Sequence, residues 1–172
     1  MKIRSVVILF IACALAASVA WADATPEECA ASTDKFRNLS ANVAEMISTS
    51  YGYAVLPTIG KGGFGIGGAG GSGCVYAGGT QTGTVKMGQV TIGFQAGGQK
   101  YAEVIFFENA EAYERFTSNK FEFAAQVSAI ALKSGVSLDA EYAEGMLVFT
   151  MAIGGLMYEA SIGGQKFKTE MY

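Results

Sequence analysis

Gly60-Lys61-Gly62-Gly63-Phe64-Gly65-Ile66-Gly67-Gly68 is the stretch of sequence that decides the fold, because it combines dense glycine with the alternation of a β-strand. In an extended chain, residues 63, 65 and 67 point to one side while Phe64 and Ile66 point to the other. This predicts a strand with one nearly bare face. Glycine weakens a strand, so a run of it implies close backbone approach, a bulge or sharp curvature.

The glycine-rich region extends well beyond this strand, since 16 of the 23 glycines fall between residues 60 and 98. Val90 and the alternate residues after it, Ile92, Phe94 and Ala96, predict a half-buried strand with its apolar side toward the core. More strands are predicted at about 101–107, 121–130, 146–153 and 156–162. A short helix capped by Asn109 is predicted over 110–117.

A longer helix is predicted at about 26–50. Thr25 suits its N-cap, Pro26 its first position, and Glu28 completes a capping box with Thr25. Its apolar residues share one face of a helical wheel. The predicted fold is therefore α+β: a glycine-rich, mainly antiparallel, strongly curved or barrel-like sheet with a long N-terminal helix and a short second helix.

The first 22 residues have the pattern of a secretion signal. A basic start is followed by an apolar run of about 14 residues, which is too short to span a membrane, and then by the cleavage-type sequence Ala20-Trp21-Ala22. We predict cleavage near Ala22 and a single domain over 23–172, in the periplasm or secreted. A lipoprotein anchored at Cys13 and a membrane helix are the alternatives.

Charge and residue counts exclude several functions. Histidine is absent, which removes histidine-based catalysis and zinc sites. Without Lys2 and Arg4 of the signal, the formal charge is 10 − 15 = −5, which argues against a nucleic-acid partner. Cys29 and Cys74 remain in the mature chain, either as one disulfide or as two buried thiols.

Two nucleotide-binding motifs match only superficially. Residues 63–68 satisfy G-x-G-x-x-G, but the following 69–73 cannot form the helix that a dinucleotide site requires. Gly62 replaces the Ser or Thr that a P-loop places after its lysine. No convergent nucleophile, base or metal-ligand set is present, so we expect no enzymatic activity, no metal and no cofactor.

Four segments together resemble the SYLF lipid-binding domain family. The first, Tyr53–Gly68, contains an apolar run ending in proline and then Lys-Gly-Gly-Phe. Residues 90–98 resemble the family's glycine-rich second block, and residues 104–116 resemble its apolar strand with a short helix. Residues 154–164 resemble its closing strand. The resemblance covers roughly residues 30–168 and implies a non-enzymatic, membrane-binding module, with phosphoinositide binding and actin bundling in eukaryotic members.

The family's lipid contact is associated with basic residues and an amphipathic N-terminal segment, which corresponds here to the helix bearing Lys35 and Arg37. That helix has a mostly acidic polar face, which weakens phosphoinositide specificity. Lys61, flanked by Gly60 and Gly62, could bind an anionic headgroup with its ammonium and neighbouring backbone N–H groups, or it could be a solvated lysine on a turn.

The sequence therefore predicts an exported module of the cell envelope whose partner is a membrane lipid or lipid-like ligand. The alternative is a structural or protein-interaction module with an envelope protein partner and no specific lipid ligand.

Overall fold

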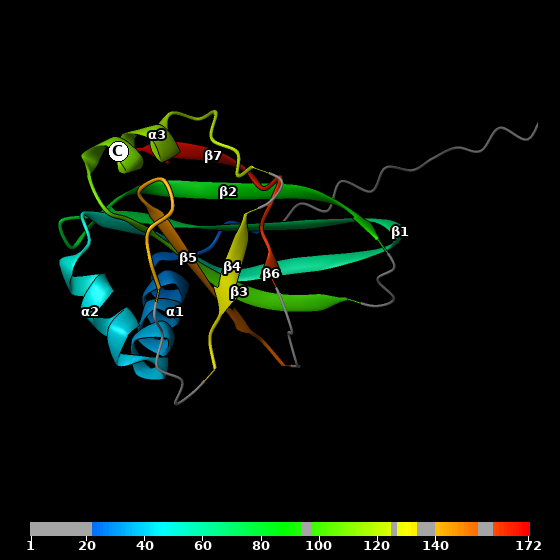
Figure 1. Ribbon diagram of the computed structural model, residues 1–172, viewed down its shortest axis with the longest axis horizontal. Helices are drawn as coiled ribbons and strands as arrows, with labels where there is room; N and C mark the ends of the chain where they lie inside the picture. Colours follow the sequence, from blue (N-terminus) through cyan, green and yellow to red (C-terminus); the bar gives the residue numbers. More distant parts are fainter. Residues whose placement is uncertain (1–21, 94–97, 125–126, 134–139, 155–159) are drawn as a thin grey trace, which may run out of the picture.

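The computed structural model describes residues 22–93, 98–124, 127–133, 140–154 and 160–172 (Figure 1). The predicted signal segment, apart from Ala22, lies outside these residues. The described residues include three helices: α1 (Pro26–Leu39), α2 (Ala41–Thr49) and α3 (Ala110–Thr117). The strands are β1 (Gly52–Ala77), β2 (Thr80–Gly93), β3 (Gln99–Phe107), β4 (Ser128–Ala131), β5 (Met146–Ala152), β6 (Ala160–Ser161) and β7 (Lys166–Met171).

The strands form one mixed sheet in the order β6-β4-β5-β3-β1-β2-β7. Only β4 and β5 pair in parallel among the described strands; the other pairs are antiparallel. The prediction of a strongly curved or barrel-like sheet is wrong, because the sheet is neither closed nor strongly curled. Helices cover parts of both faces, so apolar side chains on each face can be buried without the sheet closing on itself.

Of the roles predicted for the glycines of β1, the structure shows close backbone approach rather than strong curvature of the sheet. The first half of β1 pairs with β3 over residues 52–61, and the second half pairs with β2 over residues 65–77. These halves lie against each other, since a Cβ at Gly71 would sit 2.7 Å from the Thr58 carbonyl oxygen, and one at Gly73 would overlap the Val55 carbonyl oxygen. Figure 1 shows β1 running out and back. Glycine permits this close backbone approach.

The predicted long N-terminal helix is also wrong, because the chain breaks at Ser40. This residue is extended, with φ −150° and ψ 130°, and its carbonyl accepts the first hydrogen bond of α2 from Ala44 at 3.0 Å. The Ser40 hydroxyl has no hydrogen-bond partner among the described residues, so side-chain capping does not account for the break. The break lets Phe36 of α1 and Val43 of α2 both reach the same buried cluster.

Two apolar clusters occupy opposite faces of the sheet. On the helix-side face, defined as the face covered by α1 and α2, Phe36 and Cys29 pack with Val55, Val104 and other alternate strand residues. On the α3-side face, Phe116 packs with Ile59, Ile105 and Phe107 among others. Each strand therefore contributes alternate residues to two separate cores. The short helix predicted over 110–117 is α3, and the Asn109 side chain caps it through Ala112 N at 3.0 Å.

Candidate functional site

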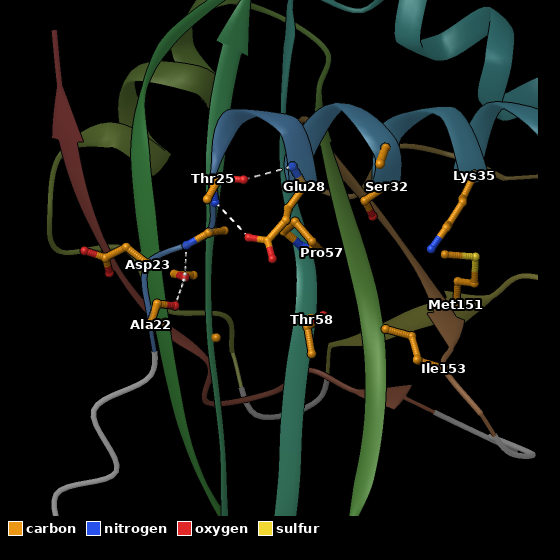
Figure 2. Close-up of a pocket in the computed structure, with 14 residues that line it drawn as sticks. Ala22, Asp23, Thr25, Glu28, Ser32, Lys35, Pro57, Thr58, Met151 and Ile153 are labelled. Atoms are coloured by element: carbon orange, nitrogen blue, oxygen red, sulfur yellow. Dashed lines mark hydrogen bonds between the residues drawn. The ribbon is translucent and has the colours of Figure 1, made fainter.

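A cavity of about 560 Å³ lies between the first turns of α1 and the helix-side face of the sheet (Figure 2). Cavities of this size commonly hold small ligands. Its walls come from the segment before α1, from α1 itself, and from β1 and β5. The residues that line it include Glu28, Ser32, Lys35, Pro57, Met151 and Ile153.

The polar wall of the cavity belongs to α1. The capping box begins the helix, with Glu28 N donating to Thr25 Oγ1 at 3.2 Å and Thr25 N donating to Glu28 Oε2 at 2.9 Å. One turn further, Ser32 is only 4% exposed, and its hydroxyl has no hydrogen-bond partner among the described residues. Figure 2 shows the Ser32 hydroxyl and the Lys35 ammonium both extending from α1 toward the sheet. A buried hydroxyl without a partner is costly, which makes Ser32 an available ligand contact.

The segment before α1 closes one end of the cavity. Ser72 Oγ on β1 accepts a hydrogen bond from Ala24 N at 2.8 Å and donates one to the Ala22 carbonyl at 3.2 Å. Asp23 forms an exposed ion pair with Lys86 of β2 at 2.8 Å. The contacts of Asp23 and Ala24 hold the first residues after the predicted cleavage position against the sheet.

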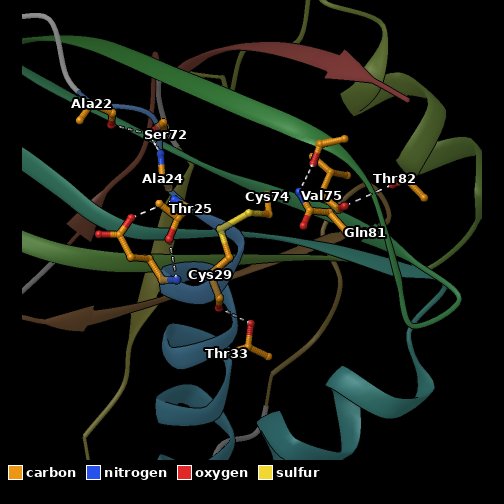
Figure 3. Close-up of a disulfide and its surroundings, with 12 residues drawn as sticks. Ala22, Ala24, Thr25, Cys29, Thr33, Ser72, Cys74, Val75, Gln81 and Thr82 are labelled. Carbon is orange, nitrogen blue, oxygen red and sulfur yellow. Dashed lines mark hydrogen bonds between the residues drawn. A yellow bond between two sulfur atoms is a disulfide. The ribbon is translucent and has the colours of Figure 1, made fainter.

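A disulfide joins α1 to the sheet beside the cavity (Figure 3). Cys29 of α1 is bonded to Cys74 of β1, their Cα atoms are 6.1 Å apart, and both residues are fully buried. Of the two possibilities that the sequence left open, the structure has the disulfide rather than two separate thiols. The bond fixes the position of α1 over β1, and with it the wall of the cavity.

The structure does not bring the predicted basic residues together. Lys35 lines the cavity, whereas Arg37 is engaged by Asp34 at 2.8 Å in an exposed ion pair. Lys61 pairs with Gln99, two residues beyond the Ile59–Tyr101 pair that packs in the α3-side cluster. Because alternate residues share a face, Lys61 is on the α3-side face, opposite Lys35. Gly60 and Gly62 flank it, and a Cβ at Gly62 would meet only open space.

Burial on β2 is the reverse of what the sequence pattern predicts. Val90 is 77% exposed, whereas Gln89 is 7% exposed and its amide donates to the carbonyls of Ser161 and Gly163 at 3.1 and 2.9 Å. Val90 pairs with Gly68 of β1, two residues from Ile66, which is 74% exposed. The two apolar side chains therefore share one face, the helix-side face that also carries Ser72.

Two further residues lie on the same side of the sheet. Ile153 is 38% exposed and lines the cavity, and its N–H donates to the carbonyl of Lys100 at 2.9 Å. Lys100 is exposed and alternates with Ala102, which is buried in the cluster beneath α1 and α2. We name this surface the apolar patch, defined as Ile66, Val90 and Ile153, with Lys35 and Lys100 as its cations. Sequence alternation missed it because Val90 has the pattern of a core residue.

A carboxyl group, that of Glu103, is buried in the core on the α3-side face. Glu103 of β3 is completely buried, and burial raises the pKa of its carboxyl to about 7 although a hydrogen bond from Gln165 opposes the shift. Tyr101 lies beside it with a pKa raised by burial and by the neighbouring carboxylate. These residues face the α3-side core and are separate from the cavity.

The described residues include no group of three or more Cys, Asp or Glu side chains able to hold a metal ion. Within the same residues, every helix is too short or too polar to cross a membrane.

Comparison with known proteins finds a family model that matches the second half of the chain. Residues 88–171 match the family described as "Ysc84: Las17-binding protein actin regulator". The SYLF resemblance is thereby confirmed. This SYLF match begins in β2 and includes β3, α3 and the later strands. The whole of the glycine-rich strand β1 lies before the matched residues.

One similar protein is Beta cell expansion factor A of Aeromonas veronii, which is 30% identical over 83 residues. The aligned region covers 48% of this chain and 32% of that protein. The chain thus matches about a third of this SYLF-family relative. Proteins of the SYLF family are binding modules rather than known enzymes.

Proposed function

We propose that the protein is an exported, non-enzymatic module of the cell envelope that binds membrane lipid through the apolar patch. The observation that carries this proposal is the reversed burial on β2, where Val90 is exposed and Gln89 is buried. Ile66 and Val90 are neighbours across the β1–β2 pairing, and exposed apolar side chains that lie together are typical of interaction surfaces. SYLF membership suggests binding of lipid or of actin-regulating partners, which agrees with a binding surface here.

The cations on the same face support an anionic membrane as the target. Lys100 lies on the face that carries Ile66 and Val90, and Lys35 extends from α1 toward that face, so the apolar side chains and both cations are on the same side of the sheet. Each lysine close to an anionic membrane surface contributes about 1 kcal/mol. The overall negative charge of the protein makes this local arrangement necessary for binding to such a membrane.

Export is supported by the signal-like N-terminus and by the Cys29–Cys74 disulfide, since disulfides persist in oxidising compartments. Mass spectrometry of the protein isolated from its host tests this part. An N-terminus at Asp23 supports export with cleavage, whereas a lipid-modified Cys13 establishes the anchored alternative. An unprocessed Met1 would contradict both.

Vesicle co-sedimentation tests the binding function. The double variant Ile66→Ser/Val90→Ser should bind vesicles containing phosphatidylglycerol at least tenfold more weakly, because each apolar side chain contributes roughly 1 kcal/mol or more on burial. Met171→Ser is the control, since Met171 is 40% exposed but lies on the edge strand β7. Unchanged binding of the double variant would overturn the proposed surface.

An envelope protein partner is the second candidate, favoured by the family's description as Las17-binding. If the protein binds neither anionic nor neutral vesicles, and cross-linking from a residue placed at Val90 captures one envelope protein, the apolar patch serves that partner and the lipid function is wrong.

A further inference from the structure

Three polar side chains form a line along α1 above the cavity. Glu28, Ser32 and Lys35 are separated by four and three residues, so they share one face of the helix. The charged ends of this line have opposite sign and lie about 10 Å apart along the axis, at 1.5 Å per residue. Ser32, almost fully buried and without a hydrogen-bond partner among the described residues, stands between them.

The two charges at the ends are available to a ligand. The ion pairs found among the described residues involve other groups, so Glu28 and Lys35 do not neutralise each other. Glu28 uses Oε2 for the capping box, which orients the carboxylate while Oε1 stays available. Beneath the line, Pro57, Met151 and Ile153 provide an apolar floor.

We propose that this cavity binds a zwitterionic phosphate–ammonium headgroup of the phosphoethanolamine type. The phosphate binds the Lys35 ammonium, the ligand's ammonium binds the Glu28 carboxylate, and the Ser32 hydroxyl donates to a phosphate oxygen. The first carbons of an acyl chain lie on the apolar floor. This inference rests on the proposed lipid-binding function and names the headgroup that the protein selects.

The charge order on α1 favours a zwitterion over a purely anionic ligand. An anion bound at Lys35 and extending along the cavity would bring its far end toward the Glu28 carboxylate, where like charges repel. A phosphate–ammonium group instead meets an opposite charge at each end. Specificity of this kind combines an attractive contact for one ligand with a repulsive contact for its competitor.

Titration calorimetry with monomeric dihexanoyl phosphatidylethanolamine tests the site at pH 7. The protein is used as the cell processes it, with its N-terminus read by mass spectrometry. Glu28→Gln and Lys35→Gln should each lower the affinity for this ligand about threefold to fivefold, as expected for one exposed charge contact. Glutamine at position 28 also suits a capping box, so the helix start is preserved. Glu27→Gln, one residue away and outside the cavity lining, is the matched control and should have no effect.

The diagnostic comparison uses dihexanoyl phosphatidylglycerol, which lacks the ammonium. Lys35→Gln should weaken the binding of this ligand too, whereas Glu28→Gln should leave its affinity unchanged or increase it. Soluble O-phosphoethanolamine distinguishes the source of the headgroup: affinity within tenfold of the lipid assigns the site to the free compound, and much weaker affinity assigns it to the lipid. Either result supports the zwitterion site.

The inference would be overturned if Glu28→Gln weakened the binding of both lipids equally, or if it weakened the binding of neither. Absence of phosphatidylethanolamine binding, together with vesicle binding that still depends on Ile66 and Val90, would overturn the headgroup site alone and leave the proposed function standing. If vesicle binding did not depend on Ile66 and Val90, that result would instead contradict the proposed function.

Discussion

The side-chain amide of Gln165 donates a hydrogen bond to Glu103 Oε2 at 3.0 Å, and both residues are completely buried. The same amide nitrogen lies 3.3 Å from the Tyr101 hydroxyl. Glu103 Oε1 and the hydroxyl of Thr150, its cross-strand neighbour on β5, have no partner among the described residues. A carboxyl in this position is favoured in its neutral form, because ionisation without a compensating charge is costly in a buried site.

The Glu103 pKa predicts that stability depends on pH. The folded-state pKa is raised from 4.5 to about 7, so the folded protein binds more protons than the unfolded chain between these values. Stability from this group is full below about pH 4.5 and is lost as the pH rises to about 7, by roughly 3 kcal/mol in total. Urea unfolding at pH 5 and pH 8 measures the difference.

Glu103→Gln keeps the shape of the side chain and removes its titration. We expect this variant to lose most of the stability difference between pH 5 and pH 8, whereas Glu111→Gln, exposed on α3, should retain it. A wild-type protein equally stable at both pH values would contradict the prediction.

The disulfide predicts a second measurable effect. The Cys29–Cys74 bond closes a loop with a sequence separation of 45 residues, for which the chain-entropy model gives a stabilisation of ~4 kcal/mol. The double variant Cys29→Ala/Cys74→Ala should therefore show a large decrease in the free energy of unfolding by urea. A reducing agent should destabilise the wild type and leave the double variant unaffected. Equal stability of wild type and variant would show that the bond contributes little.

The close approach within β1 predicts opposite effects at two glycines. Gly73→Ala places a Cβ onto the Val55 carbonyl oxygen, so the two halves of β1 must separate, at a cost of about 1–3 kcal/mol. Gly88→Ala on β2 meets nothing within 4 Å and should be neutral or slightly stabilising. Thermal unfolding of both variants measures the difference, and similar melting temperatures would refute the steric explanation.

The opposite placement of the lysines predicts which face meets a membrane. Lys100→Ala and Lys35→Ala should each weaken binding to phosphatidylglycerol vesicles by roughly fivefold at moderate salt, with little change for neutral vesicles. Lys61→Ala, on the α3-side face, should have a smaller effect. If Lys61→Ala is the most damaging of the three in co-sedimentation, the membrane meets the α3-side face and the patch assignment is wrong.

Local sequence was sufficient where the deciding interactions are local. The capping box of Thr25 and Glu28 predicted the start of α1, and Asn109 predicted the start of α3, because these contacts join residues three apart. The alternation around residues 60–68 predicted an extended, glycine-dependent backbone for the same reason. The end of the first helix was missed, because Ser40 ends it so that Phe36 and Val43 can pack on the same strands.

The functional surface depended on contacts between distant segments. Alternation shows that Gln89 and Val90 face opposite ways, but only the packing partners decide which of them is buried. Here the carbonyls of Ser161 and Gly163 bind the Gln89 amide, which places Val90 outside. Sequence likewise identified Lys35 and Lys61 as cations near apolar or glycine-rich segments, and the strand register alone put them on opposite faces. The sequence by itself determined the local elements and their polarity. The tertiary structure decided which faces meet, because burial and proximity arise from residues far apart in the chain.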